Sequence, residues 1–338
     1  MATRADVAKL AEVSASTVSY ALNGKRSIKA ETRERVLDAV EKLNYSPHIA
    51  AGVLAGGKPK SVALIFPSYG GNFSSLHLDY VQGVIDGAKS RNYHVIVWPQ
   101  EEVSTQEIVQ FKKSGLIAGV ILIEIMENDK RVKAFAKEKI PFVMIGRTNS
   151  SKTLKYVDRD FEKVAEIAAE HLVSLGHKKI AVLTQKRMVE STVISVDERF
   201  TQAVKKYTEK FGLAADFLVG DNSIASGGSF FVELFKRPKK VSAVIGLTDL
   251  ATLGFVNAAR AAGISIPSEI SVLGLNTQLG QIDLISPALT SVYVPAKEMG
   301  NSAVNILIDE LNEESVHITQ QLLAGHLVVA KSTGQAPK

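Results

Sequence analysis

The residues with the most definite chemistry lie near the amino terminus, where small polar side chains recur at helical spacing. Ala15, Ser16, Ser19 and Tyr20 fall on one face of a predicted helix, and three of these four side chains are small. A helix with such a face fits the DNA major groove, where hydroxyl groups reach base edges or phosphates. The chemistry predicted for these residues is hydrogen bonding to DNA rather than catalysis.

Two short helices and a tight turn must hold that face in place. Thr3 can cap the first helix, and Asp6, three residues later, completes a capping box. Ser14 can cap the second helix, and Asn23 followed by a glycine provides a stop. An ordinary helical hairpin has the same outline. The caps, the turn and the place near residue 1 together favour a DNA-binding helix-turn-helix.

The distribution of charge agrees with this interpretation. Residues 1–60 hold 10 basic and 6 acidic side chains, whereas the remainder of the 338-residue chain holds 30 and 29. The positive excess is therefore concentrated in the segment that would meet phosphates. The excess is modest, so it supports the motif without standing alone.

The sequence indicates neither an enzyme nor a membrane protein. The chain has no cysteine, and its seven histidines are scattered without metal-ligand spacing. No nucleophile motif or cofactor loop occurs, so we expect no catalytic residue, no metal and no cofactor. Neither a signal-peptide pattern nor an apolar run of about 20 residues occurs, so we expect a soluble, cytoplasmic protein.

From about residue 61 onward, apolar strands alternate with amphipathic helices. This order is typical of parallel sheets covered on both faces, and two such series predict two doubly wound lobes. The first series has strands near 62–66, 95–98, 119–123 and 142–145, and helices near 76–91, 104–114 and 129–138. The second has strands near 180–184, 217–219, 243–246 and 271–274, and helices near 161–175, 198–211, 225–236 and 249–262. The predicted fold class is α/β with an all-α amino-terminal headpiece.

Residues 6–24, which read DVAKLAEVSASTVSYALNG, resemble the headpiece of the lactose-repressor (LacI/GalR) family of bacterial transcription regulators. The resemblance extends over essentially the whole chain. It implies that Ala15, Ser16 and Tyr20 read bases and that Thr17 and Ser19 hold the phosphate backbone. The full set of expected DNA-binding residues is Thr3, Ser14, Ala15, Ser16, Thr17, Ser19, Tyr20, Asn23, Ala51 and Leu54.

Two positions in the headpiece depart from the family pattern, and the hinge matches it imperfectly. Glu12 replaces the glycine of the turn, and Lys29 replaces a serine, so a third helix near 31–43 is expected to lack its cap. In the family the hinge folds as a helix in the minor groove, where paired leucines wedge between base steps. Leu54 matches that leucine, and Ala51 matches the small residue one turn before it. A plain flexible linker has the same composition.

The resemblance also implies a domain organisation with a periplasmic-binding-protein-like body. We expect a headpiece at 1–46, a hinge or linker at 47–60, and an effector-binding and dimerisation core at 61–338. The chain is expected to cross between the lobes near 158–161, 287–292 and 322–326. These crossings place the N-lobe at about 61–159 and 291–323, and the C-lobe at about 160–290 and 324–335.

Ligands in such folds bind between the lobes, beyond the carboxyl ends of the strands. By the resemblance, Arg199 is a ligand-binding residue whose guanidinium can fork two hydroxyls or grip a carboxylate. Asn276 replaces an aspartate, which makes the pocket less acidic. Asp249 is expected to cap the helix that it begins. The expected ligand-binding set is Tyr69, Phe73, Arg147, Arg199, Asn222, Thr248 and Asn276.

The implied function is that of a homodimer that binds operator DNA, represses carbohydrate-related genes and is gated by a small effector. The effector is expected to be a sugar or a sugar derivative, and the sign of its effect stays open. The tail lacks leucine heptads, so a dimer is expected, with its surface near 76–91, 100–113 and 280–284. Two other readings stay open: a transport-type sugar-binding protein, and a DNA-binding regulator that needs no effector.

Overall fold

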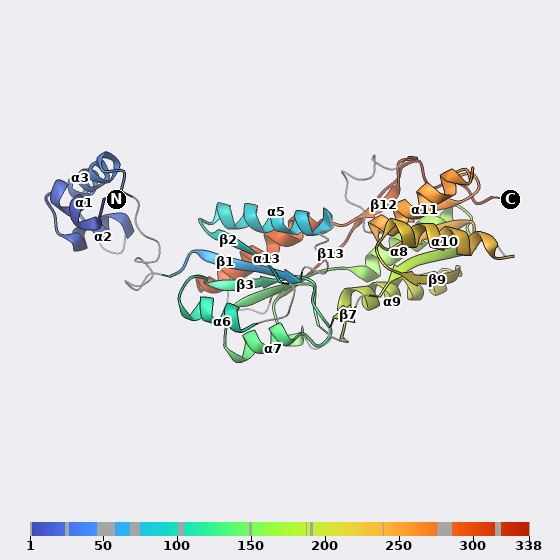
Figure 1. The fold of residues 1–338 in the computed structure, drawn as a ribbon, viewed down its shortest axis with the longest axis horizontal. Helices are drawn as coiled ribbons and strands as arrows, with labels where there is room; N and C mark the ends of the chain where they lie inside the picture. The colour runs from blue at the N-terminus through green and yellow to red at the C-terminus, as the bar shows by residue number, and fades with distance from the viewer. Residues whose placement is uncertain are drawn as a thin grey trace. The chain divides into compact units, whose positions relative to one another are not determined.

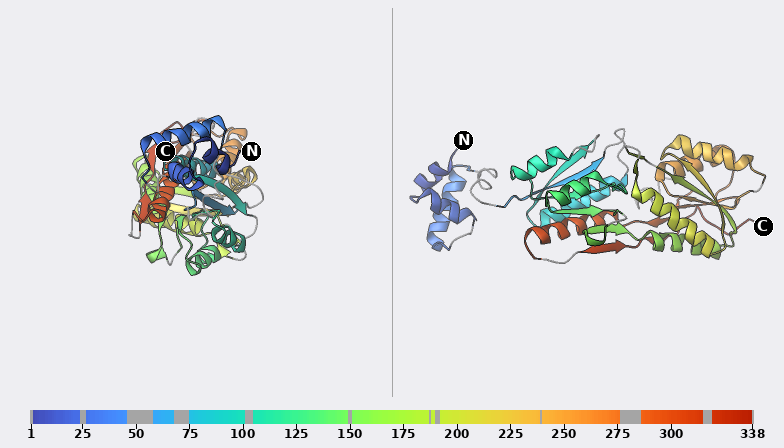
Figure 2. Two further views of the ribbon diagram at one scale, coloured as in Figure 1. Left: turned by 90° about the vertical axis from the view of Figure 1, so that its left-hand side faces the viewer. Right: turned by 90° about the horizontal axis from the view of Figure 1, so that it is seen from below.

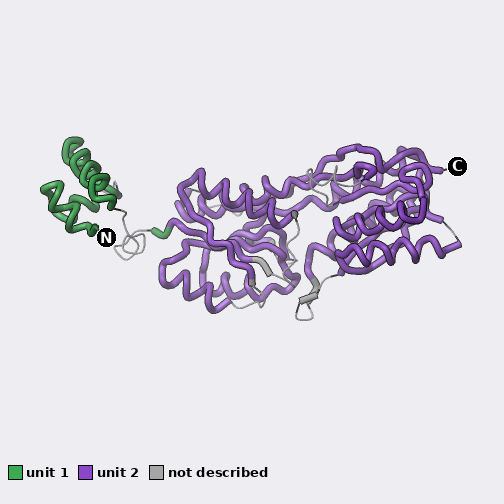
Figure 3. The backbone as a smooth tube through the Cα atoms, turned by 45° about the horizontal axis from the view of Figure 1, so that its top comes forward, with its two compact units in different colours: residues 1–59 green, residues 60–338 purple. Residues whose placement is uncertain are grey.

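The computed structural model describes residues 2–23, 27–45, 58–67, 75–100, 105–148, 151–186, 188–189, 192–238, 240–275, 286–314 and 319–337. Five predicted site residues lie outside these ranges: Ala51, Leu54, Tyr69, Phe73 and Asn276. The chain forms two compact units, residues 1–59 and residues 60–338 (Figure 3). Each unit has its own core and is described by itself.

The first unit contains α1 (Arg4–Leu10), α2 (Ala15–Asn23) and α3 (Ala30–Lys42) (Figure 1). One valine from each helix, Val7, Val18 and Val36, is fully buried at its centre. These residues recur at helical spacing within amphipathic segments, so burying that stripe packs the three helices around one small core.

Hydrogen bonds at the helix starts confirm the predicted caps. The Thr3 hydroxyl accepts from the Asp6 N–H, and an Asp6 carboxylate oxygen accepts from the Thr3 N–H at 2.8 Å, which completes the capping box of α1. Lys29 occupies the cap position of α3 and makes no capping hydrogen bond there, as predicted. A side chain therefore satisfies a backbone N–H group in the first turn of α1, whereas the Lys29 side chain does not do so for α3.

The N-lobe of the second unit has two helices on each face of a parallel sheet (Figures 1 and 2). Its elements are β1 (Ser61–Pro67), α5 (Ser75–Ser90), β2 (His94–Gln100), α6 (Gln106–Lys113), β3 (Gly119–Leu122), α7 (Lys130–Lys137), β4 (Phe142–Ile145), β5 (Tyr156–Arg159), α13 (Ala296–Leu311) and β13 (Gln320–Leu323). The strand order is β13-β5-β4-β3-β1-β2. Val62 and Leu64 of β1 pack under α5 and α13, whereas Ala63 and Ile65 pack under α6 and α7. This alternation follows from the period of two along a strand.

The C-lobe repeats this arrangement around a second six-stranded sheet. Its elements are α8 (Phe161–Ser174), β6 (Lys179–Gln185), α9 (Ser195–Lys210), β9 (Ala214–Gly220), α10 (Ile224–Lys236), β10 (Ala243–Gly246), α11 (Asp249–Ala261), β11 (Ser271–Gly274), β12 (Thr290–Tyr293) and β14 (His326–Val328). The strand order is β14-β12-β11-β10-β6-β9, with β14 antiparallel to its neighbour. Helices α8 and α9 cover one face, and α10 and α11 cover the other. The short strands β7 (Met188–Val189) and β8 (Thr192–Val193) pair separately.

The chain passes between the two lobes after β5, after β12 and after β13. The second of these crossings differs from the prediction of 287–292. Residues 290–293 form β12, which pairs with β11 and β14 inside the C-lobe sheet, so the crossing follows Tyr293. At the third crossing, a Cβ on Gly325 would lie 2.5 Å from the carbonyl oxygen of Tyr293. This close approach holds two of the crossing segments side by side and requires glycine.

Each lobe contains a pair of helices whose backbones touch at glycine. In the N-lobe, a Cβ on Gly83 of α5 would lie 1.9 Å from the Lys297 carbonyl oxygen in α13. In the C-lobe, a Cβ on Gly227 of α10 would lie 2.1 Å from the Ala251 carbonyl oxygen in α11. The absence of a side chain at these positions sets the spacing of both pairs.

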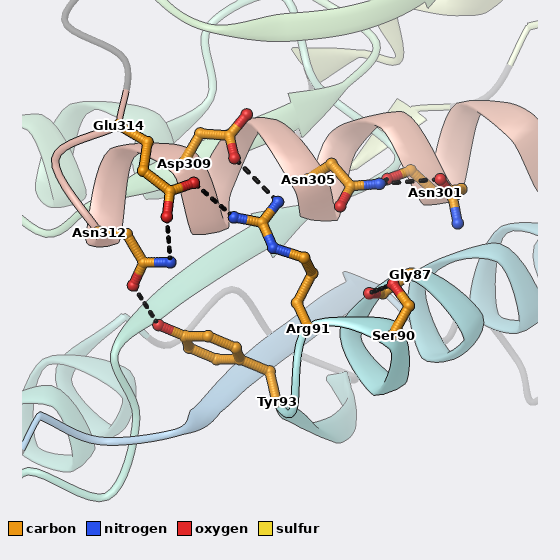
Figure 4. A network of polar contacts seen from close by, with 9 residues as sticks. All are labelled: Gly87, Ser90, Arg91, Tyr93, Asn301, Asn305, Asp309, Asn312 and Glu314. Carbon is orange, nitrogen blue, oxygen red and sulfur yellow. Dashed lines mark hydrogen bonds and ion pairs between the residues drawn. The ribbon is translucent and has the colours of Figure 1, made fainter. Parts of the chain in front are cut away.

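The α5–α13 pair ends in a polar network beside the start of β1 (Figure 4). Arg91, which follows α5, pairs with Asp309 at 2.9 Å and with Glu314 at 2.7 Å. The Lys60 ammonium group lies 4.3 Å from the centroid of the nearby Tyr93 ring. These contacts therefore connect the start of β1 and the end of α5 to the end of α13.

Candidate functional site

Hydroxyl groups gather at the amino-terminal end of α2. The Ser14 Oγ accepts from the Thr17 N–H at 3.1 Å, which confirms the predicted cap of this helix. The same oxygen lies 2.7 Å from the Ser16 Oγ and 2.8 Å from the Thr17 Oγ1. Because the first turn of a helix also presents backbone N–H groups and a positive dipole end, this hydroxyl cluster (Ser14, Ser16 and Thr17) suits a phosphate oxygen.

The predicted base-reading side of α2 points away from the headpiece core. Ala15 and Ser16 are exposed, and Ser19 and Tyr20 are half-buried, whereas Val18 on the opposite side is fully buried. The Thr3 hydroxyl donates to the Asp6 carboxylate at 2.8 Å, so its first role is to shape the start of α1. Asn23 ends α2, as predicted, and its side chain lies outside the described residues.

In the body, the structure brings both predicted arginines to one carboxylate. The Arg199 Nη1 of α9 donates to an Asp158 carboxylate oxygen at 2.5 Å, and the Arg147 Nε lies 3.3 Å from the same oxygen. Asp158 belongs to β5 in the N-lobe, whereas Arg199 belongs to the C-lobe. The ion pair therefore joins the two lobes, and Asp158 is only 3% exposed within it.

Three hydrogen bonds made by Ser195 reinforce this junction. The Ser195 hydroxyl, in the first turn of α9, donates to the Arg147 carbonyl at 3.0 Å and accepts from the Arg199 Nε at 3.1 Å. The Ser195 N–H donates to the Ile125 carbonyl at 3.1 Å. These bonds attach the start of α9 to the loops that follow β3 and β4. We call this set of contacts the lobe junction.

The lobe junction borders a cavity, here called the cleft cavity, at the carboxyl ends of the N-lobe strands. Its lining includes His77, Glu124, Asp158, Arg159 and Arg199, from α5, β5, α9 and the segment after β3. The His77 Nε2 lies 2.9 Å from a Glu124 carboxylate oxygen, and both side chains are 12% exposed. The cavity thus presents cations, carboxylates and apolar side chains together, a composition suited to a polar small molecule.

The cleft cavity is small in this arrangement of the lobes. Its volume is about 30 Å³, which leaves room for a water or two rather than for a sugar ring. Burial lowers the pKa of the Arg199 guanidinium, and the Asp158 carboxylate opposes that shift. Since the guanidinium stays charged, anything that draws Asp158 away must offer Arg199 another acceptor.

Two further predicted residues lie together at the start of α11. The Asn222 side-chain amide donates to the Asp249 carboxylate at 2.9 Å, and its oxygen accepts from the Leu250 N–H at 3.0 Å. Asp249 was expected to cap this helix, and its carboxylate does accept from the Leu250 N–H at 2.9 Å, but Thr248 occupies the cap position and Asn222 shares the capping with Asp249. Thr248 is buried. Neither Asn222 nor Thr248 is among the described residues that line the cleft cavity.

Asp158 is the central residue that reading the sequence missed. The sequence analysis placed a lobe crossing near Asp158, but it did not predict β5, the buried strand that carries this residue. Polar residues at the carboxyl ends of parallel strands face ligand clefts in open α/β folds. His77 and Glu124 were also missed, because they lie 47 residues apart and their side chains meet only when α5 packs near the end of β3.

Within the described part of the chain, no group of three or more His, Asp or Glu side chains is arranged to hold a metal ion. Of the helices in that part, none has the length and the apolar content needed to cross a membrane.

Comparisons with known proteins cover both units of the chain. Residues 3–48 match the model of the bacterial regulatory proteins of the lacI family, and residues 169–333 match a periplasmic binding protein-like domain. The HTH-type transcriptional regulator AglR of Rhizobium meliloti (strain 1021) is 30% identical over 340 residues, which cover 98% of this chain and 94% of AglR. Catabolite control protein A of Priestia megaterium is 27% identical over 317 residues, which cover 92% and 93% of the two chains.

Solved structures of regulators share the fold. The lac repressor dimer bound to operator and the anti-inducer ONPF superposes with a TM-score of 0.84 at 24% identity, covering 98% of this chain and 99% of the repressor. The complex of the transcriptional regulator CelR with cellobiose gives a TM-score of 0.72 at 24% identity, covering 98% and 100%.

These matches identify a DNA-binding transcriptional regulator rather than an enzyme, and they do not favour the alternative of a transport-type binding protein. Because residues 3–48 match the family model and a regulator aligned over nearly the full length of both chains is 30% identical, this chain belongs to the lacI family of bacterial regulatory proteins.

Proposed function

We propose that the chain acts in the cytoplasm as a homodimeric repressor of carbohydrate-related genes, released from or locked onto its operator by a small effector in the cleft cavity. The observation that carries this proposal is the Arg199–Asp158 pair, which joins the lobes beside that cavity. A ligand that competes for either residue changes the free energy of lobe closure. The solved complex of CelR holds cellobiose, which supports a sugar or sugar derivative as the effector.

The DNA-reading part of the proposal rests on α2. The hydroxyl cluster would grip a phosphate and so fix the register of the helix, and Tyr20 with Ala15 would contact base edges or thymine methyl groups. Two headpieces would read the half-sites of a near-palindromic operator, as suits a two-fold dimer. The lac repressor dimer bound to operator supports this arrangement. Ser19, Thr3 and Asn23 complete the proposed contact surface.

The hinge would transmit the signal between the two units. Leu54 from each protomer would wedge into a central base step, with Ala51 giving room one turn earlier. Folding of the hinge on DNA costs conformational entropy. The free energy of this folding would therefore depend on how the effector-binding cores of the two protomers position the hinge segments. The polar network around Arg91 and Tyr93 would make the base of the N-lobe rigid enough to pass on such a change.

Effector entry requires the lobe junction to change, because the described cavity holds only about 30 Å³. An incoming hydroxyl or carboxylate would replace Asp158 on the Arg199 guanidinium, and Arg147 would follow because it contacts the same carboxylate oxygen. Tyr69, Phe73, Asn222, Thr248 and Asn276 remain proposed contributors from the surrounding loops. Whether closure favours or opposes operator binding decides between an inducer and a corepressor.

The test is operator binding by the full-length protein, measured by fluorescence anisotropy on DNA from upstream of its own and neighbouring genes. A panel of mono- and disaccharides that includes cellobiose is added to the preformed complex. Release by one sugar identifies an inducer, and tighter binding identifies a corepressor. Binding that no sugar alters would instead support the alternative of an effector-independent regulator.

Three variants separate the parts of this proposal. Arg199→Ala is expected to abolish the sugar response and retain operator binding, and a preserved response would remove Arg199 from the site. Leu54→Ala is expected to weaken operator binding while ligand binding stays intact, and an unchanged affinity would contradict the hinge model. Arg237→Ala is the matched control, because this half-buried arginine pairs with Glu233 and Asp216 away from the cleft cavity.

A further inference from the structure

A second cavity lies in the C-lobe, at the amino-terminal ends of the sheet strands. The cleft cavity lies at the carboxyl ends of strands. The second cavity borders the segments that precede β10 and β11, and these two strands run parallel to each other. Its volume is about 330 Å³, against about 30 Å³ for the cleft cavity. Small-molecule sites typically occupy roughly 300–1,000 Å³. The second cavity therefore has the size of a ligand site and is separate from the lobe junction.

Four of the seven described residues that line this cavity are apolar. Leu234 and Phe235 come from the last turn of α10, Val241 from the segment before β10, and Pro337 from the carboxyl-terminal tail. Leu234 is 4% exposed, and Phe235 and Val241 pack against the same core. An apolar group of a few carbon atoms would be enclosed by side chains from three separate segments, so its burial would be favourable.

Among the described residues that line the cavity, Lys240 is the one cation and Glu269 the one anion, and they belong to different segments. Lys240 precedes β10, and it forms no ion pair with any acidic side chain of the described residues. Glu269 precedes β11, and one of its carboxylate oxygens accepts from the Ser265 N–H at 2.8 Å, which fixes its position. The two charges border the same space without pairing with each other. A ligand that carries both opposite charges would satisfy both residues at once.

We propose that this cavity binds a small apolar α-amino acid. The ligand carboxylate meets the Lys240 ammonium group, the ligand ammonium meets the Glu269 carboxylate, and the ligand side chain lies against Leu234 and Phe235. The Ser242 hydroxyl, which lies 2.9 Å from the His177 Nδ1, borders the polar end. A sugar, whose hydroxyl groups surround its ring, suits this cavity less well because four of the seven lining side chains offer no hydrogen-bond partner.

The experiment is isothermal titration calorimetry of the full-length protein with L-leucine and L-phenylalanine as probes. Saturable binding of at least one of them is expected. Isocaproate, which lacks the ammonium group, and isopentylamine, which lacks the carboxylate, are each expected to bind about tenfold more weakly than L-leucine, the equivalent of one charge-assisted hydrogen bond. The absence of binding by both amino acids would overturn the proposal.

Variants then test the location of the site. Lys240→Gln and Glu269→Gln are each expected to weaken amino-acid binding about tenfold, because each removes one ligand charge partner. Lys236→Gln is the control, since this exposed lysine at the end of α10 lies four residues earlier and does not line the cavity. Arg199→Ala should leave the amino-acid affinity unchanged. Loss of amino-acid binding in Arg199→Ala would place the amino acid at another site. Unchanged affinity in both Lys240→Gln and Glu269→Gln would do the same.

Discussion

The headpiece and the cleft cavity differ in how far apart along the chain their contacting residues lie. Ser14 contacts Ser16 and Thr17, two and three residues away, whereas Arg199 reaches back 41 residues to Asp158. The first set of contacts forms whenever α2 forms. The second forms only when two lobes with separate cores come together. The cleft contacts therefore report the position of the lobes, and the headpiece contacts do not.

This difference assigns separate tasks to the two regions. A surface that must present the same groups to every operator benefits from local contacts, which hold without help from the rest of the fold. A surface that must respond to an effector benefits from contacts that break when the lobes move, because a ligand shifts an equilibrium only by its differential affinity for the two states.

The largest effect is expected where backbones from distant segments touch. Gly227→Ala places a Cβ 2.1 Å from the Ala251 carbonyl oxygen, so α10 and α11 must move apart. We expect a loss of about 3 kcal/mol in the free energy of unfolding, near the upper end of overpacking costs. Urea denaturation followed by circular dichroism measures it.

Gly228→Ala is the control one residue later in the same helix. A Cβ at Gly228 meets no described atom within 4 Å, so replacing a helical glycine there should stabilise the protein by about 0.5–1 kcal/mol. Equal effects of the two substitutions would show that contact between the helices does not determine the stability of this lobe.

The next effect is expected in the lobe junction. Asp158→Ala leaves Arg199 and Arg147 without their shared carboxylate, and the side chain it removes is 3% exposed. We expect a loss of about 2–3 kcal/mol, less than for a fully buried pair because Arg147 is partly solvated. The same denaturation experiment measures it.

Asp216→Ala provides the comparison, because Asp216 pairs with Arg237 where both side chains are more than a third exposed. Its cost should stay below about 1 kcal/mol. If Asp158→Ala and Asp216→Ala lower the free energy of unfolding equally, the lobe junction contributes no more than a surface ion pair. The long-range contacts of the cleft would then not stabilise the arrangement of the lobes.

A pH dependence is expected from the long-range contacts of two histidines. The ring nitrogens of His171 and His177 lie 2.9 Å from the Thr333 hydroxyl oxygen and 3.2 Å from the Gly334 carbonyl oxygen, more than 150 residues away. Burial lowers the pKa of both histidines below the ordinary value of 6.5. The unfolded chain therefore binds more protons than the folded chain as the pH falls. The free energy of unfolding should be constant above about pH 6.5 and should decrease below it. The decrease is at most about 1.4 kcal/mol per pH unit for each histidine.

Denaturation midpoints between pH 5 and pH 8 measure this decline. His177→Gln should reduce the slope, whereas His94→Gln, which changes an exposed histidine of β2, should leave it unaltered. A slope that survives the loss of His177 and of His171 would assign the pH dependence to other groups.

Much of the fold could be predicted because its signals are local or periodic. The Thr3–Asp6 box and the Ser14 cap are readable from residue spacing alone, and the structure confirms both. Buried strands such as β1 and β10, and amphipathic helices such as α9, were found at nearly their observed bounds. Helical and strand periodicities survive in any context that buries one face.

The elements that were missed depend on distant partners. β5, with the sequence Tyr-Val-Asp-Arg, ends in two charged residues and reads as a loop until β4 and β13 pair with it. β12 was taken for a lobe crossing, because no local signal shows that it pairs with β11 and β14. Asp158 and the Asn222 cap of α11 were missed for the same reason. Reading them would have required the strand order, which spacing along the chain does not contain.

The smallest effect is expected at the headpiece caps, where it also tests the local end of the comparison. Ser14→Ala removes the acceptor of the Thr17 N–H and should destabilise α2 by about 1 kcal/mol. Lys29→Ser should do the reverse for α3, because Lys29 occupies an uncapped position with extended backbone angles. Hydrogen exchange of the α2 and α3 amides in full-length protein without DNA measures both changes separately from operator binding. Since these contacts are local, exchange in the body should be unchanged in both variants. Faster exchange around Arg199 in Ser14→Ala would contradict the independence of the two regions, and no change in α2 would show that the hydroxyl cluster contributes nothing to the helix it begins.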